Sequence, residues 1–316
     1  MPELPNSVSQ QANVPIVKSP IKFSIQIATK NRRGDLEVTL KNIAHLLERD
    51  DVECIVTDDG SSDGTFDFVI STYPKIIARR NESSLGYLVC RNQMLNSTAT
   101  YVVTLDDDAH FLSENPLEEI ETHFESHREC GLLAFRILWS KTPPSTLISD
   151  EKSVRVRGYV GCGHAWRMES WKKIPSYPEW FKFYGEETFA SMHLFLRNIE
   201  IHYLPQVLIQ HRVDLQARKN NKDYKVRYRN GLRADYFLFF LFLPWRLIPN
   251  KLGYSVYAQL SIRIFKGEFA MLWPLLSALW QVISHFPRLL RERSAFTKEE
   301  YDAYLRLEGT KIYWKP

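Results

Sequence analysis

The chain has 316 residues and a formal net charge of +4, and 44% of its residues are hydrophobic and 25% charged. These values are ordinary for a globular protein and exclude a fibrous or disordered chain, and the length suits one large domain or one domain with an appendage. We expect no nucleic-acid partner. The four cysteines are scattered without a CxxC pair, which favours core thiols in a reducing cytosol over disulfides or metal ligands.

The first segment, residues 1–20, is polar, contains four prolines and lacks an apolar core. We therefore expect a flexible N-terminal tail and no signal peptide. Two apolar runs follow, residues 23–28 and residues 52–57, and each predicts a buried strand. A polar loop and a helix follow each run, the first helix reaching about residue 47 and the second beginning near residue 65.

A third apolar run, residues 101–105, ends at three consecutive aspartates, Asp106, Asp107 and Asp108. Adjacent carboxylates repel one another, and a hard cation such as Mg²⁺ or Mn²⁺, which prefers oxygen ligands, relieves that repulsion. The structural alternative is a solvated acidic turn.

The repeated order of strand, polar loop and helix is typical of a parallel sheet covered by helices. Ligands of such sheets bind beyond the carboxyl ends of the strands. The sequence therefore predicts one functional edge, which collects Thr29, Asp58, Asp59 and the aspartate triplet.

Four short motifs together resemble the GT-A glycosyltransferases of family 2. They are Ile-Ala-Thr-Lys-Asn-Arg, Val-Thr-Asp-Asp-Gly-Ser-Ser-Asp-Gly-Thr, Gly86 with Arg91-Asn92, and Leu-Asp-Asp-Asp. The resemblance covers residues 21–215 and implies an α/β catalytic domain with the GT-A fold, a mostly parallel sheet flanked by helices. It also implies an inverting transfer of a sugar from a nucleotide-sugar donor to a hydroxyl on a glycan, a polysaccharide of the cell envelope or a lipid-linked acceptor.

The resemblance assigns roles to the motif residues. Nucleotide-sugar binding falls to Thr29, Asn31, Asp58, Asp59, Gly86, Arg91, Asn92, Asp106 and Asp107. Within this set, Asp58 or Asp59 would bind the nucleobase, and Asp106 would lie on the ribose side.

The metal, Mn²⁺ or Mg²⁺, would be held by Asp108 and by a histidine that the family carries at the end of a later strand. Residues 200–209 predict that strand, and His211 follows it. His202, within the strand, is the competing candidate.

A carboxylate pair, Glu186 and Glu187, opens a predicted helix that continues to about residue 196. Acidic residues in a first helical turn complement the helix dipole, which is the structural alternative. An inverting transfer needs a carboxylate to accept the proton of the acceptor hydroxyl. The family carries Glu-Asp here, so the resemblance assigns the base to Glu187 and makes Glu186 its partner.

A glycine-rich segment, residues 155–167, precedes the carboxylate pair and ends at Arg167. Glycines let the backbone approach a ligand closely, and in the family a segment like this lines the acceptor side. A strand with a bulge is the structural alternative.

The remaining chain, residues 216–316, is expected to be a basic, apolar helical extension. Residues 211–316 hold 19 Lys and Arg against 9 Asp and Glu. The apolar runs at 236–244 and 269–284 are shorter than the ~20 residues that span a bilayer. Apolar helices with basic flanks and tryptophans favour peripheral binding to an anionic membrane, at the inner face of the plasma membrane. The alternative is packing on the catalytic domain or on a second subunit as a homodimer.

Two other functions share parts of this pattern. A nucleotidyltransferase acting on sugar phosphates also uses metal-binding carboxylates on a parallel sheet, but it normally has a glycine-rich basic loop after the first strand, and residues 29–34 contain one glycine. A non-catalytic scaffold of the same fold would not need the aspartate triplet, the glutamate pair and the histidine together.

Overall fold

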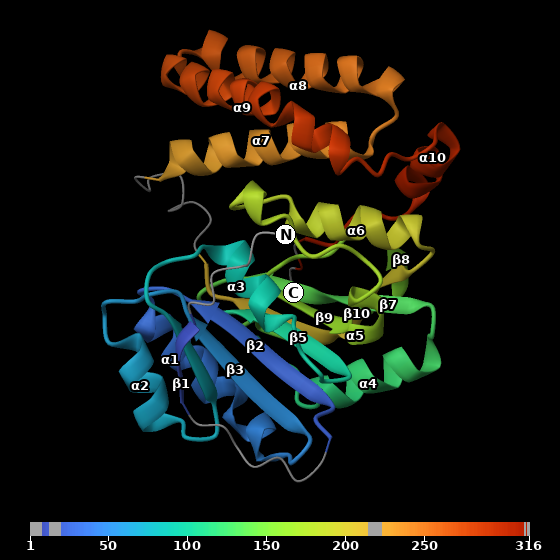
Figure 1. Ribbon diagram of the computed structural model, residues 1–316. Helices are drawn as coiled ribbons and strands as arrows, with labels where there is room; N and C mark the ends of the chain where they lie inside the picture. The colour runs from blue at the N-terminus through green and yellow to red at the C-terminus, as the bar shows by residue number, and fades with distance from the viewer. Residues whose placement is uncertain (1–7, 13–19, 214–222, 313, 315–316) are drawn as a thin grey trace.

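The computed structural model describes residues 8–12, 20–213, 223–312 and 314 (Figure 1). Within these residues the strands form one ten-stranded sheet in the order β1-β4-β3-β2-β5-β9-β7-β10-β6, and β8 pairs with β10. The strands are β1 (Val8–Ala12), β2 (Phe23–Thr29), β3 (Val52–Asp58), β4 (Ile77–Asn81), β5 (Tyr101–Asp106), β6 (Ala109–Phe111), β7 (Cys130–Trp139), β8 (Val154–Val156), β9 (Gly163–Arg167) and β10 (Glu200–His211).

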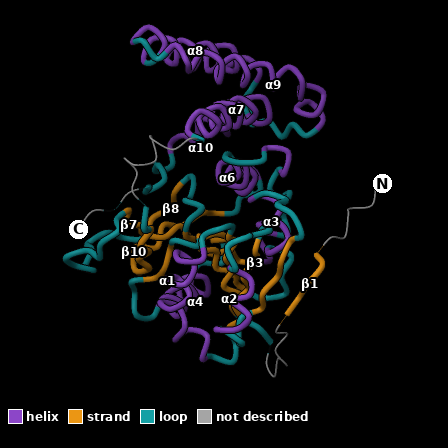
Figure 2. Tube along the Cα trace, turned by 90° about the vertical axis from the view of Figure 1, so that its left-hand side faces the viewer, coloured by secondary structure: helices purple, strands orange, loops and turns teal. Residues whose placement is uncertain are grey.

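Helices cover the sheet and continue into the C-terminal region (Figures 1 and 2). The α-helices are α1 (Arg33–Ile43), α2 (Thr65–Thr72), α3 (Tyr87–Met94), α4 (Pro116–Ser126), α5 (Met168–Trp171), α6 (Glu186–Leu196), α7 (Tyr224–Phe242), α8 (Ile248–Ile262), α9 (Leu272–Arg291) and α10 (Lys298–Arg306). Short 3₁₀ helices are η1 (Ala44–Glu48), η2 (Glu179–Phe181), η4 (Trp245–Leu247), η5 (Ile264–Lys266) and η6 (Phe269–Met271).

The central strands confirm the predicted mostly parallel sheet. Strands β4, β3, β2 and β5 are parallel neighbours, and β9 runs antiparallel between β5 and β7. Thr29 pairs with Asp58 across β2 and β3, and Ala28 pairs with Asp106 across β2 and β5. The register therefore brings the carboxyl ends of three strands, and the loops that follow them, to one edge.

Each face of the sheet has its own apolar core. Helices α1, α2 and α4 cover one face, where α1 buries Leu36, Leu40 and Ile43 at the spacing of one helical side. The other face is covered by α3, α5 and α6, and its core continues into α7, α9 and α10. The helical extension is therefore built onto the catalytic domain through a shared core.

The N-terminal segment differs from the expected flexible tail at Val8–Ala12. These residues form β1, which pairs antiparallel with β4 at the edge of the sheet. The predicted boundary between residues 215 and 216 lies outside the described residues.

Helices α7, α8 and α9 form a layer above the α/β domain in both ribbon views (Figures 1 and 2). The described chain contains one helical stretch, Phe269–Arg291, that is long and apolar enough to cross a membrane by length and composition, and 28% of an apolar 18-residue window within it is buried. The sequence predicted a shorter run, because Pro274 was expected to interrupt it. Pro274 instead lies in the first turn of α9, where the missing backbone N–H would have had no helical partner.

After α10 the chain returns to the sheet. Glu308 forms a bridge with Val156, and Trp314 forms one with Leu138. The indole Nε1 of Trp139 donates a hydrogen bond to the Ile312 carbonyl at 2.7 Å. The extension is thus attached to the α/β domain both at α7 and beyond α10.

Candidate functional site

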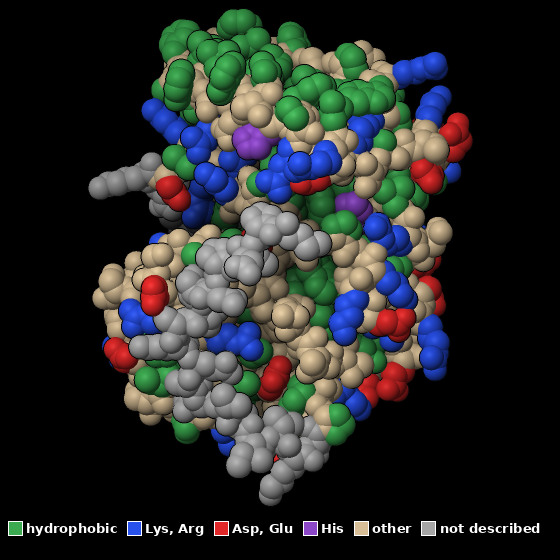
Figure 3. All heavy atoms as spheres, in the orientation of Figure 1, with side chains coloured by type: hydrophobic (Ala, Val, Ile, Leu, Met, Phe, Trp, Pro, Cys, Tyr) green, Lys and Arg blue, Asp and Glu red, His purple; other side chains and the backbone are tan. Residues whose placement is uncertain are grey.

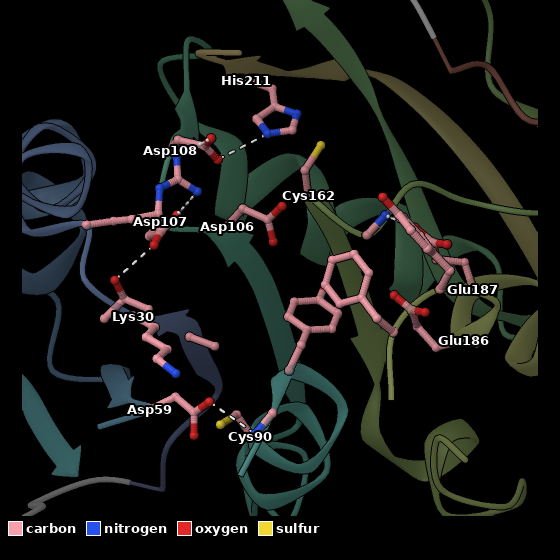
Figure 4. Close-up of a pocket in the computed structure, with 18 of the residues that line it drawn as sticks. Lys30, Asp59, Cys90, Asp106, Asp107, Asp108, Cys162, Glu186, Glu187 and His211 are labelled. Carbon is pink, nitrogen blue, oxygen red and sulfur yellow. Dashed lines mark hydrogen bonds and ion pairs between the residues drawn. The ribbon is translucent and has the colours of Figure 1, made fainter. Parts of the chain in front are cut away.

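A cavity of about 580 Å³ opens at the carboxyl ends of β2, β3 and β5. Figure 4 shows the aspartate triplet and His211 on one side of it, Glu186 and Glu187 on the opposite side, and Asp59 at a third position. A cavity of this size is within the usual range for small-molecule sites. Of the residues that the sequence collected at one edge, Thr29, Asp59 and the aspartate triplet line this common space, and Asp58 does not.

Three side chains form a candidate cation site. Asp106, Asp108 and His211 each offer a ligand atom, and these atoms lie within 4.8 Å of one another. His211 reaches the triplet because β10 pairs with β6, which opposes His211 to Ala109. The site includes Asp106, which the sequence placed on the ribose side, and excludes His202, which lies near the other end of β10.

The donor atoms suit a cation. The Nε2 of His211 lies 3.0 Å from Oδ1 of Asp108. The two atoms are buried and are each other's close polar contact, and among the described residues Nδ1 of His211 is buried without a hydrogen-bond partner. A divalent ion between Nε2 and Oδ1 would replace their direct contact, and carboxylate oxygens with one imidazole nitrogen suit Mn²⁺ or Mg²⁺.

Arg32 is a cleft residue that the sequence interpretation did not assign. Its Nη1 lies 2.7 Å from Oδ1 of Asp107, and its Nη2 lies 2.6 Å from Oδ2 of Asp108. Thr29 donates a further hydrogen bond to Asp107 at 2.8 Å. Asp107 therefore binds protein groups, while Asp106 and Asp108 face the cation position. The feature of the sequence that could have indicated Arg32 is a basic residue directly after the loop at the end of β2.

The neighbouring aspartates differ in proton affinity. Burial, opposed by Arg32 and reinforced by the other two aspartates, raises the pKa of Asp107 to about 7. Burial acts on Asp108 in the same direction, but His211 and Arg32 outweigh it and lower the pKa of Asp108. Asp108 is therefore the carboxylate of this pair that stays ionised as a ligand at neutral pH.

Asp58 and Asp59 have different surroundings. The Asp59 carboxylate lines the cavity and accepts hydrogen bonds from Ser84, Asn81 and the backbone N–H groups of Leu85 and Gly86. Burial would raise the pKa of Asp59, but these bonds together lower it. The alternative candidate, Asp58, is buried behind the loop and accepts from the Ser61 backbone N–H.

The loops beside Asp59 are fixed by the other assigned residues. Gly86 lines the cavity with φ of 98°, a conformation that favours glycine. Asn31 joins the two polar loops, since its side chain accepts from Ser62 N–H and its own N–H donates to Ser61.

Arg91 and Asn92 lie on different sides of α3. The guanidinium of Arg91 contacts Asp106 at 2.5 Å, and so it supports the cation site from behind. The amide of Asn92 lies outside the cavity and binds the backbone of Tyr177. Sequence spacing alone could not separate two neighbours whose side chains a helix turns about 100° apart.

The glutamate pair stands at the first turn of α6, after Gly185 with φ of 88°. The backbone N–H of Gly161 donates to Oε1 of Glu187 at 2.9 Å. Among the described residues, Oε2 of Glu186 is buried without a hydrogen-bond partner. Burial and the charge of Glu187 raise the pKa of Glu186 to about 8, so Glu186 holds its proton at neutral pH. Burial also raises the pKa of Glu187, but the Gly161 N–H favours its ionised form.

The glycine-rich segment contributes through Gly161. A Cβ built at this position would lie 2.9 Å from Oε1 of Glu187, so a side chain would displace the carboxylate. Arg167, which was expected on the acceptor side, instead donates to the backbone carbonyls of Phe124, His127 and Cys130 at the far end of β9.

Further aromatic and basic residues complete the cavity wall and had not been assigned from sequence. They are Lys30, Tyr87, Trp139, Lys182, Phe183, Tyr184 and Arg227. Arg227 belongs to α7, so the helical layer reaches the cavity. Lys30 lies within a quoted motif, whereas the other residues belong to α3, β7, α7 and the segment before α6, which are far apart in the chain.

Comparison with known proteins gives a family and a fold. Residues 24–203, more than half of the chain, match the family model described as glycosyl transferase family 2. No curated protein matches the sequence.

Several solved structures share the fold. GalNAc-T7 with UDP, GalNAc and Mn²⁺ aligns with a TM-score of 0.55 at 14% identity, over 71% of this chain and 48% of that chain. TarS of S. aureus aligns with a TM-score of 0.52 at 18% identity, over 70% and 40%. The mannosyltransferase PcManGT of Pyrobaculum calidifontis, with GDP-Man and Mn²⁺, aligns with a TM-score of 0.51 at 16% identity, over 92% and 81%. The chain therefore spans about half of the first of these proteins and most of the third.

Proposed function

The chain belongs to glycosyl transferase family 2, and we propose that its cleft transfers a sugar from a nucleotide-sugar to an acceptor hydroxyl with inversion at the anomeric carbon. One observation carries the proposal: a candidate cation site and a buried carboxylate pair line the same cavity from opposite sides. A donor diphosphate and an acceptor hydroxyl need these two groups on either side of the reacting carbon.

Donor binding divides between two parts of the cleft. Asp59, held ionised by its hydrogen bonds, accepts from the nucleobase at one end. Asp106, Asp108 and His211 would hold the divalent ion, which neutralises charge on the leaving nucleoside diphosphate. Mn²⁺ is the ion to test first, because the GalNAc-T7 and PcManGT structures contain it.

The transfer is one in-line displacement. The acceptor oxygen attacks the anomeric carbon, and Glu187 accepts the proton of the acceptor hydroxyl. The bond between the anomeric carbon and the diphosphate oxygen breaks, and its electron pair goes to the diphosphate oxygen. The Gly161 N–H favours the ionised form of Glu187 and orients it, while Glu186 retains its own proton. This division of roles supports Glu187 as the base.

The test is a panel of nucleotide-sugars and nucleoside triphosphates, each with Mn²⁺, screened by thermal stabilisation and by product analysis. We expect a nucleotide-sugar to raise Tm in the wild type and to give a glycosylated product or free sugar, and Asp108→Asn to lose both effects. Stabilisation and turnover by a triphosphate with a sugar phosphate would instead establish a nucleotidyltransferase. Binding without turnover of any donor would leave a non-catalytic scaffold.

We further propose that the helical layer attaches the enzyme to an anionic membrane. Apolar side chains gather at the top of the layer in Figure 3, over α8 and α9. They include Tyr254, Tyr257, Ile262, Phe265, Phe269, Trp273, Leu276, Trp280 and Ile283, all at least 50% exposed. Soluble proteins rarely expose a contiguous apolar surface of this kind without a partner.

Basic side chains lie next to this apolar surface. Arg246, Lys251, Lys266, Arg288 and Arg291 are exposed on the same helices and their connections. Figure 3 shows Lys and Arg gathered directly below the apolar top of the layer. Tryptophans beside basic side chains suit the headgroup region of an anionic bilayer, which attracts each Lys or Arg by about 1 kcal/mol.

This attachment would bring the cleft to a lipid-linked or membrane-bound polymeric acceptor. The layer is next to the cleft, because Arg227 belongs to α7 of the layer and lines the cavity. Co-sedimentation with anionic vesicles at low and high salt tests it. We expect binding that weakens with salt and persists in part, since salt screens charge and leaves apolar insertion. A protein that stays in the supernatant under both conditions, and forms a stable dimer that shields Trp273 and Trp280, would make the layer a subunit interface.

A further inference from the structure

A second group of potential metal ligands lies away from the cleft. His123 and His127, one helical turn apart at the end of α4, stack with ring centroids 4.2 Å apart. His202, near the start of β10, approaches both rings edge-on, at 5.2 Å and 5.3 Å. Each imidazole offers a nitrogen, and these three atoms lie within 4.8 Å of one another.

A carboxylate orients the central imidazole. Nε2 of His202 lies 2.8 Å from Oε2 of Glu200, so Nε2 carries the proton and donates it. The Nδ1 lone pair of His202 then faces Nε2 of His123 at 2.9 Å. Metal-binding histidines are commonly fixed in this manner, with the outer N–H donating to a carboxylate.

Two of the three imidazoles are shielded from water. His123 and His202 are buried, and His127 is half-buried at the end of α4. Arg155 contacts the other oxygen of Glu200 at 2.8 Å and so fixes the position of that carboxylate.

We propose that His123, His127 and His202 form a structural site for Zn²⁺ or a similar transition metal, separate from the cation site of the cleft. Three imidazole nitrogens suit Zn²⁺, whereas Mg²⁺ and Mn²⁺ prefer oxygen ligands. The ion would replace the proton that His123 and His202 share. Glu200 would remain the partner that orients His202.

The position favours a structural role. His202 pairs with Leu133 and His211 with Trp139, six residues apart on β7, so the two sites are separated by about 20 Å along the sheet. The ion would join the end of α4 to the beginning of β10, on the side of the sheet remote from the cleft. It would therefore fix the helix that supports β7 and β10 without entering the reaction.

Zn²⁺ binding to the full chain at neutral pH tests the proposal, by isothermal titration and by metal content after dialysis. Asp108→Asn provides a background in which the cleft ligand is lost, and we expect it to retain one Zn²⁺ per chain. Adding His127→Gln or His202→Gln should abolish that binding. Glu200→Gln should weaken it by about 10–100-fold, as loss of an orienting carboxylate does elsewhere. His45→Gln, at an exposed histidine of η1, is the matched control and should change nothing.

Two results would overturn the site. One is a background variant that binds no Zn²⁺, and the other is unchanged stoichiometry and affinity after His127→Gln. Because His127 is half-buried at the end of a helix, this variant is expected to fold, and its circular dichroism and metal-free Tm check that it does. Zn²⁺ should also raise Tm in the background variant and leave Tm unchanged after His127→Gln.

Discussion

The cleft and the outer helical layer depart from ordinary burial in opposite directions. In the cleft, charged groups are buried: Asp107 is 4% exposed and Asp108 is 2% exposed. On the layer, large apolar groups are in contact with water: Trp273 is 76% exposed and Trp280 is 66% exposed. Both arrangements are unfavourable for an isolated protein. On the functions proposed above, a cation with a diphosphate would complete the first region and a lipid surface would cover the second.

Removing a cleft carboxylate should have the largest effect. Asp108→Ala should lower kcat/KM by at least about 10³-fold, because loss of a metal ligand removes several kcal/mol of charge stabilisation. Mn²⁺-dependent binding of the nucleotide should disappear with it. Steady-state kinetics and nucleotide titration measure both, and Asp67→Asn, at an exposed aspartate of α2, is the control. Full activity in excess chelator would contradict the metal assignment.

The carboxylate pair should show a smaller and unequal effect. Glu187→Gln should lower kcat by about 10²-fold with little change in donor affinity, since the amide keeps the shape but cannot accept the proton. Glu186→Gln should retain more activity. Gly161→Ala should resemble Glu187→Gln, because the added Cβ meets Oε1 of Glu187. A larger loss in Glu186→Gln than in Glu187→Gln would exchange the roles of the two residues.

Substitutions on the outer layer should change vesicle binding rather than folding stability. Trp273→Ser with Trp280→Ser should weaken vesicle binding by roughly 10–100-fold for each side chain, the effect of removing about 1.5–3 kcal/mol of apolar burial. Tm in solution should change little, because both side chains are exposed. Ile148→Ser removes a 79%-exposed apolar residue from the α/β domain and is the control. Equal vesicle binding by the double variant and the control would separate the layer from the membrane.

A still smaller effect should appear in the pH dependence of stability. The pKa of Glu186 is raised to about 8 from its ordinary 4.5, so between these values the folded protein holds a proton that the unfolded chain has released. The free energy of unfolding must then fall as pH rises through this window. Glu186→Gln should therefore be more stable than the wild type at pH 8 and above, by about 1 kcal/mol or more.

Thermal unfolding of both proteins from pH 5 to pH 9 measures this difference, which should shrink toward the acidic end. Glu37→Gln, at an exposed position on α1, is the control. A constant difference across the pH range would mean that Glu186 is not held protonated by the fold.

The sequence predicted the sheet and most of the cleft because both follow from local order. Apolar strands that end in polar loops must align their carboxyl ends, so Thr29, Asp59 and the triplet had to meet. Local order did not predict that Glu186, Glu187 and His211 reach the same cavity, because they belong to elements far along the chain. Their assignment came from the family resemblance.

What the sequence could not predict depends on side-chain direction and on partners from distant segments. Arg32 neutralises Asp107 and Asp108 only because α1 begins beside the triplet. Asn92 leaves the cavity because α3 turns it away from Arg91. The two tryptophans lie on the outer side of α9, and periodicity alone did not show which side of that helix would be buried.

The contacts of Trp139 indicate how long the shortest active fragment of the chain must be. Its ring lies 4.4 Å from that of His211, and its indole N–H is held by the carbonyl of Ile312. The segment that matches the family model ends at residue 203, before His211 itself and more than a hundred residues before Ile312. A fragment cut at the family boundary would thus lack His211 of the proposed cation site. One cut after α10 would retain His211 but lose the Ile312 carbonyl that holds its aromatic neighbour, Trp139.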